Sequence, residues 1–79
     1  MISFDIRLSK IDDVRKFVGI TGQSGADVDL ASGRYLVDAK SIMGIFSLDL
    51  TQPVNVQIHS DHREEEANAL AEALAPFRV

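Results

Sequence analysis

The chain has no cysteine and no tryptophan among its 79 residues. Without cysteine it has no disulfide framework, no thiolate nucleophile and no cysteine zinc site, in agreement with a reducing cytoplasm. Basic residues are also few, because eight Lys and Arg stand against twelve Asp and Glu, a net charge of −4. Nucleic-acid binding needs a positive stripe to neutralise phosphates, so we expect no nucleic-acid partner.

Long hydrophobic runs are missing too. The N-terminal residues 1–7 alternate between apolar and polar types, unlike a signal peptide or a membrane span. We therefore expect a cytoplasmic protein with no membrane partner. Hydrophobic residues make up 46% and charged residues 25%, as in ordinary soluble domains. A chain of this length allows one domain, 1–79, whose single core must include nearly every large apolar residue.

Period-two alternation predicts four strands, because alternate side chains of a strand point to opposite faces. Residues 2–8 form the first, 26–30 and 34–37 form a hairpin around Ser32-Gly33, and 54–59 form the fourth. Each strand has one polar face. We therefore expect an antiparallel sheet with one face in water and helices covering the other.

A first helix is predicted over about 10–21, where Ile11, Val14 and Phe17 recur at helical spacing. Ser9 is the expected N-cap, and the glycines of 22–25 are expected to end the helix.

Two further helices follow. Residues 41–47 form a short one capped by Ser41, and residues 61–75 form a longer one. Asp61 and Glu64 resemble a capping box at its start, and Pro76 is expected to end it. The order β-α-β-β-α-β-α defines an α+β domain but leaves the strand order open, so a ferredoxin-like sandwich remains an alternative.

The segment 40–48 reads Lys-Ser-Ile-Met-Gly-Ile-Phe-Ser-Leu. It resembles the KSIMG signature of HPr, the histidine-containing phosphocarrier of the bacterial sugar phosphotransferase system. Residues 27–58 align with such sequences without an obvious gap, and the acidic, alanine-rich helix 64–74 is similar as well. The resemblance implies an open-faced β-sandwich: four antiparallel strands in the order 1-4-2-3, with three helices on one side.

The chain departs from that family at its phosphotransfer loop. No Gly-x-His-x-Arg-Pro motif follows the first strand, and Lys10 or Ile11 falls near the place of the phosphoacceptor histidine. A lysine ammonium is protonated at neutral pH and cannot act as the nucleophile. Asp12 and Asp13 add negative charge where an incoming phosphoryl group needs cations and free amides. We therefore expect that histidine phosphotransfer is lost and that the protein is not an enzyme.

Two histidines remain as replacements, His59 at the end of the last strand and His62 near a helix start. Their spacing of three, with Asp61 between them, could suggest a metal site or a displaced phosphoacceptor. We favour ordinary surface histidines, because in the family's topology neither lies near the first helix.

Three acidic residues could also suggest a cation site. Alternation already explains Asp27 and Asp29 as residues on the solvent face of a strand, and Asp38 follows the next strand. Paired catalytic acids need a pocket, for which a domain this small has little room. We expect no metal and no cofactor.

The resemblance points to two functional features within the signature. Ser41 matches a serine that a dedicated kinase phosphorylates in some HPr branches, although a plain N-cap worth about 1 kcal/mol is the favoured interpretation. Ile42, Met43 and Phe46 match the family's apolar docking patch for enzyme I, sugar permease domains and regulators. Helical spacing cannot turn every apolar residue of this segment inward, so we expect part of this patch to be exposed.

We therefore expect a binding or regulatory module of the phosphotransferase system that does not transfer phosphate through histidine. One alternative is a working phosphocarrier with a non-standard phosphoacceptor. Another is a structural protein that self-associates through the polar sheet face or the edge hairpin.

Overall fold

The computed structural model describes all residues, 1–79, and contains four strands and three α-helices. A short 3₁₀-helix, η1, lies near the C-terminus. The elements are β1 (Ile2–Ile6), α1 (Ile11–Gln23), β2 (Asp27–Ser32), β3 (Tyr35–Asp38), α2 (Ile42–Phe46), β4 (Val54–His59), α3 (Glu64–Ala73) and η1 (Ala75–Phe77).

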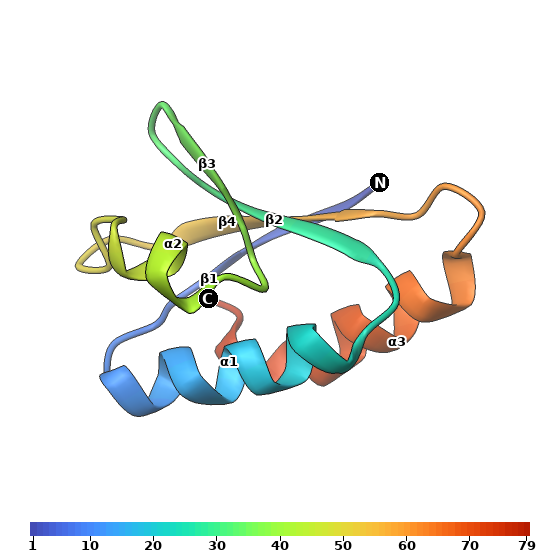
Figure 1. Cartoon of the computed structure of the whole chain (residues 1–79), viewed down its shortest axis with the longest axis horizontal. Coiled ribbons are helices and arrows are strands. Elements are labelled where there is room, and N and C mark those ends of the chain that lie inside the picture. Colours follow the sequence, from blue (N-terminus) through green and yellow to red (C-terminus); the bar gives the residue numbers. More distant parts are fainter.

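The four strands form one antiparallel sheet in the order β1-β4-β2-β3. The central pairing sets Val28 opposite Ile58, and Ile58 in turn opposite Ile2. Figure 1 shows α1 and α3 lying side by side along one face of the sheet, with α2 at one end. The order agrees with the one that the resemblance implies, so the ferredoxin-like alternative does not apply. The expected α+β open-faced sandwich is confirmed.

The core lies between this sheet and its helices, as the alternation predicts. Phe17 of α1 is fully buried and meets the ring of Phe77 edge-on, with ring centroids 6.0 Å apart. The inward strand residues, which share near-complete burial, are Phe4, Ile6, Val28, Leu30, Val54, Val56 and Ile58. The opposite face of the sheet carries polar side chains, and there Asn55 forms hydrogen bonds with Ser3, Asp5 and Gln57.

The two edges of the sheet differ. The C-terminal residues run along β1: Arg7 donates its backbone N–H to the carbonyl of Phe77 (2.9 Å), and Val79 donates to that of Asp5 (3.2 Å). The guanidinium of Arg78 stacks over the Phe4 ring at 4.4 Å. The β1 edge is therefore covered, whereas β3 forms the other edge of the sheet.

The first strand is shorter than its alternation suggests. It ends at Ile6, opposite Val54, although Leu8 is still buried. The partner strand begins after Pro53, which has no N–H to extend the ladder.

The predicted start of α1 is wrong by one residue. Lys10 occupies the N-cap position and Ser9 does not, and the helix continues through Gly22 to Gln23. Ile11 is 61% exposed rather than part of the buried stripe, because the helix's buried residues are Val14, Phe17 and Thr21.

The last helix also begins later than predicted. Residues 61–63 form a turn in which Arg63 N–H donates to Ser60 O, and His62 has a positive φ of 62°. The expected Asp61–Glu64 capping box therefore does not form, since the helix begins at Glu64. Pro76 lies inside η1 instead of directly ending α3. No helix is long and apolar enough to cross a membrane.

Candidate functional site

The short helix α2 is held in place by its N-cap. Ser41 has an extended backbone, and its hydroxyl accepts a hydrogen bond from Gly44 N–H at 3.1 Å. The cap predicted from the sequence is therefore confirmed. A five-residue helix has little stability of its own, so the cap and the packing of one face must hold it.

The two faces of α2 have different environments. Ile45 is fully buried, and Ile42, three residues earlier, is partly buried against the core. Met43 and Phe46, also three residues apart, are 77% and 43% exposed. Residues at this spacing share a helix face, so the burial of Ile45 turns Met43 and Phe46 outward. The structure thus separates the predicted patch: Met43 and Phe46 face solvent, and Ile42 lies at its inner border.

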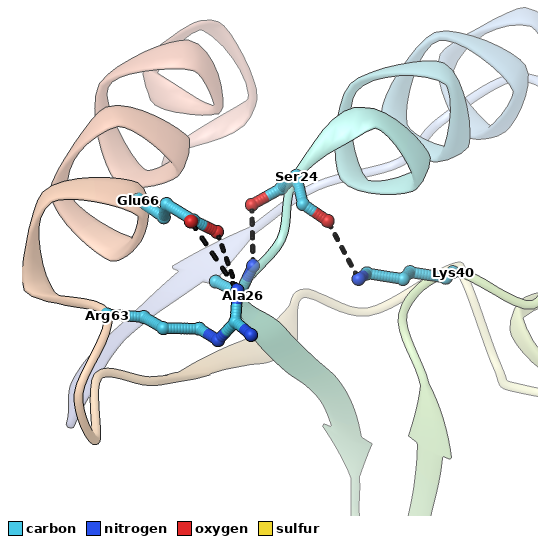
Figure 2. Close-up of polar contacts among 5 residues, drawn as sticks. All are labelled: Ser24, Ala26, Lys40, Arg63 and Glu66. Carbon is cyan, nitrogen blue, oxygen red and sulfur yellow. Dashed lines mark hydrogen bonds and ion pairs between the residues drawn. The ribbon is translucent and has the colours of Figure 1, made fainter.

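Lys40, the first residue of the signature, has a role that the sequence did not reveal. Its Nζ donates a 2.9 Å hydrogen bond to the carbonyl oxygen of Ser24, the residue that ends α1 (Figure 2). The last turn of α1 contains no basic residue, so this ammonium supplies the positive charge that a helix C-terminus favours. Lys40 therefore ties the entry of α2 to the end of α1.

Neighbouring contacts close the same junction. The Ser24 hydroxyl accepts a hydrogen bond from Ala26 N–H at 3.1 Å, which turns the chain into β2 (Figure 2). Arg63 and Glu66, at the start of α3, form an ion pair of 3.4 Å beside this loop. The buried Thr21 hydroxyl donates to the carbonyl of Ala39 at 2.8 Å. The Lys40 and Thr21 bonds therefore tie the segment before α2 to the end of α1, whereas the Arg63–Glu66 pair lies within the start of α3.

The start of α1 lacks an imidazole. The Asp13 carboxylate accepts hydrogen bonds from the backbone N–H groups of both Ser9 and Lys10, each at 3.1 Å. In a capping box the N-cap side chain also accepts a hydrogen bond from the helix, but the lysine side chain of Lys10 has no acceptor atom. Only the bonds from the backbone to Asp13 therefore form. A carboxylate therefore already occupies the amides of the loop that enters α1.

Both histidines lie at the other end of the molecule. Figure 1 shows the start of α1 and the β4–α3 connection at opposite ends of the molecule. His59 is the last residue of β4, and His62 lies within the connection. His59 Nε2 lies 2.9 Å from an Asp29 carboxylate oxygen. His62, in the turn, is exposed.

The three strand acids are neighbours but do not form a cation site. Asp29 lies directly opposite Asp38 in the β2–β3 register, and Asp27 is opposite His59. A shallow hollow of about 390 Å³ lies over them and is also lined by Lys40 and His59. No three His, Asp or Glu side chains are grouped so that they could hold a metal ion.

Comparison with known proteins agrees with this fold. The profile of the family described as "PTS HPr component phosphorylation site" matches residues 13–77. A comparison with functionally curated proteins gives no match.

Two solved structures are similar over most of the chain. HPr-C-His from Thermoanaerobacter tengcongensis shares 26% identity at a TM-score of 0.69, over 90% of this chain and 85% of that one. The phosphocarrier protein HPr from Bacillus anthracis str. Ames shares 25% identity at a TM-score of 0.66, over 91% and 92% respectively. Because the family profile spans most of the sequence and the fold agrees with these structures, the chain belongs to the HPr family of the phosphotransferase system.

Proposed function

We propose that this member of the HPr family binds or regulates phosphotransferase-system proteins without carrying phosphate on histidine. One observation carries the proposal: a carboxylate, and no imidazole, lies at the start of α1, while Met43 and Phe46 remain exposed on α2. Acting with such partners would place the protein in the cytoplasm.

The chemistry at α1 supports the loss of transfer. Asp13 binds the amides of Ser9 and Lys10 with its own negative charge, and Asp12 is exposed beside it. A phosphoryl group arriving there would find these two amides already bonded to a carboxylate, even though Arg7, Lys16 and Arg78 line the same hollow as Asp13. Lys10 lies near the position of the family histidine, and its ammonium has no lone pair at neutral pH.

The apolar patch, Ile42, Met43 and Phe46, supports the binding role. Exposed large apolar side chains have an unfavourable free energy of contact with water, which a partner removes when it covers them. Aromatic residues are also common in binding hot spots. Methionine is flexible and adapts to different partner surfaces. The patch sits on a helix fixed by the Ser41 cap and by Lys40, so its residues are held in place before a partner arrives.

Phosphotransfer is tested directly with enzyme I and phosphoenolpyruvate. We expect no acid-labile phosphoprotein from this chain, while an HPr that contains the active-site histidine is phosphorylated in the same reaction. A stoichiometric acid-labile product would overturn the proposal.

Replacing both histidines separates the remaining carrier alternative. His59 Nε2 lies against the Asp29 carboxylate, which can only accept a hydrogen bond, so in the neutral ring Nδ1 keeps the free lone pair and His59 is the histidine that this alternative would use. If the wild type becomes labelled and the His59→Ala/His62→Ala variant does not, the non-standard carrier alternative is correct.

Docking is tested by titrating labelled protein with phosphotransferase-system proteins and recording amide chemical shifts. We expect shifts centred on α2, and at least a tenfold loss of affinity for Met43→Lys and Phe46→Lys, in the range typical of hot-spot residues. Val79→Lys is the matched control, because Val79 is a similarly exposed apolar residue, 68%, at the end of the chain and outside α2. Equal losses for the control and the patch variants would contradict docking through α2.

A further inference from the structure

The β3 strand is an open sheet edge with large apolar side chains. Tyr35 is 71% exposed and Leu36 60%, and Figure 1 shows the tip of the β2–β3 hairpin rising clear of the three helices, while Val37 at the base of β3 lies close to Gly44 of α2. The opposite edge, β1, is covered by the C-terminal residues. Edge strands of soluble proteins are usually protected by short length, charged side chains, proline or a bulge; β3 is short and contains one charged residue, Asp38, but no lysine or proline.

The backbone of β3 has free hydrogen-bonding groups in a known direction. Ala39 N–H donates to Val28 O at 3.0 Å, so this cross-strand pair is hydrogen-bonded. Bonded and non-bonded pairs alternate in an antiparallel ladder, so Val37 is bonded to β2 as well. Leu36 and Asp38 therefore turn their backbone groups away from β2. The Asp38 carbonyl accepts from Ser41 N–H, whereas no bond outside the sheet reaches Leu36.

We propose that two copies of this chain associate through β3, pairing antiparallel around Leu36 and joining their two sheets into one. In this arrangement Leu36 lies opposite Leu36 of the second copy, and their backbones exchange both hydrogen bonds. The same two-fold register places Arg34 of each copy opposite Asp38 of the other. Tyr35 of one copy then lies opposite Val37 of the other on the helix side.

Charge selects this register. Neither Arg34 nor Asp38 forms an ion pair within the chain, and Asp38 lies directly opposite another carboxylate, Asp29. Asp29 contacts His59 (2.9 Å), whereas Asp38 accepts the backbone N–H of Lys40 (2.9 Å) and has no cationic side chain paired with it, so an arginine from the second copy supplies an opposite charge. Centring the pair on Val37 would remove both Arg–Asp contacts and would present backbone groups already bonded to β2.

The interface is small. One short strand from each copy buries less than the roughly 1,200 Å² below which complexes are typically weak and transient. We therefore expect reversible dimers that form between micromolar and millimolar protein concentrations, detectable by sedimentation equilibrium.

Charge exchange tests the register. Arg34→Glu places two carboxylates opposite each other at each end of the paired strands, and Asp38→Arg places two guanidinium groups opposite each other. Each variant alone should therefore dimerise about tenfold less tightly. A mixture of the two variants restores opposite charges at both ends. We therefore expect heterodimers in the mixture at the wild-type affinity. Arg15→Glu, the same charge change at an exposed position of α1, is the control and should keep the wild-type affinity.

Three results would overturn the proposal: a wild-type monomer at every concentration up to millimolar, weakening by Arg15→Glu equal to that by Arg34→Glu, or no heterodimer in the mixture. Circular dichroism establishes that each variant is folded before the comparison. Leu36→Lys gives a second measure, because it should abolish association while leaving the exposed monomer edge folded. Docking to other proteins through α2 does not enter any of these measurements.

Discussion

Lys40 and Ser24 are joined by a 2.9 Å hydrogen bond between a side-chain ammonium and a backbone carbonyl 16 positions apart. The bond connects the residue before the Ser41 cap to the residue that ends α1. The most recognisable segment of this sequence therefore contains two kinds of residue. Lys40 and Ser41 position α2, and Met43 and Phe46 are the side chains that this position exposes.

Replacing Lys40 by methionine should destabilise the fold. Methionine keeps an unbranched apolar chain and removes the ammonium, which leaves the Ser24 carbonyl without its charged donor. We expect a loss of about 1–2 kcal/mol in the free energy of unfolding, measured by urea denaturation. Lys16→Met, at an exposed position of α1, should change stability by less than about 0.5 kcal/mol. Equal effects of the two variants would mean that the Lys40 bond contributes nothing.

Ser41 and Ser9 provide a matched test of capping. The sequence favours both as N-caps, but only Ser41 accepts a hydrogen bond from its helix. Ser41→Ala should therefore cost about 1 kcal/mol, and Ser9→Ala close to nothing. Ser41→Asp should retain most of the stability, because aspartate caps as well as serine does. A larger loss for Ser9→Ala than for Ser41→Ala would show that the α1 boundary described here is wrong.

The strands were predictable because burial alternates along them. Phe4, Val28 and Val56 face the core while their neighbours face water, so period two located all four strands to within two residues of each boundary. The strand order was not contained in this pattern, since any order with the same buried face satisfies it. It came from the resemblance carried by residues 40–48.

The helix starts were harder to predict, because a good capping residue does not decide where the chain enters a helix. Leu8 is drawn into the core, so α1 can begin only after Lys10. The positive φ of His62 keeps Asp61 outside α3. The site divides in the same way. The exposure of part of the apolar patch followed from helical geometry, whereas the bond from Lys40 to a backbone carbonyl has no sequence signature.

The free energy of unfolding at acid pH should depend on Asp49. Thr51 donates its hydroxyl and its backbone N–H to the Asp49 carboxylate, which lowers the pKa of Asp49 below its ordinary value. A lowered pKa means that folding favours the ionised form. The resulting stability is present above the ordinary pKa and is lost as the pH falls through the folded-state pKa.

An NMR titration of the Asp49 carboxyl carbon measures this directly. In Thr51→Val the hydroxyl donor is absent, so the pKa of Asp49 should rise toward its ordinary value while the backbone donor remains. Thr51→Ser keeps a hydroxyl at the same position and is the matched control, in which the pKa of Asp49 should stay lowered. An unchanged midpoint in Thr51→Val would show that the hydroxyl does not set the pKa.

Ile45 and Met43 should separate stability from binding. Ile45 has no exposed surface, so Ile45→Ala leaves a cavity under α2 and should cost about 2–5 kcal/mol. Met43 is 77% exposed, so Met43→Ala should change the free energy of unfolding by less than about 0.5 kcal/mol. Thermal and urea denaturation measure both. If Met43→Ala destabilised the protein as much as Ile45→Ala does, α2 would be rotated in solution, and Met43 would belong to the core instead of to a surface for partners.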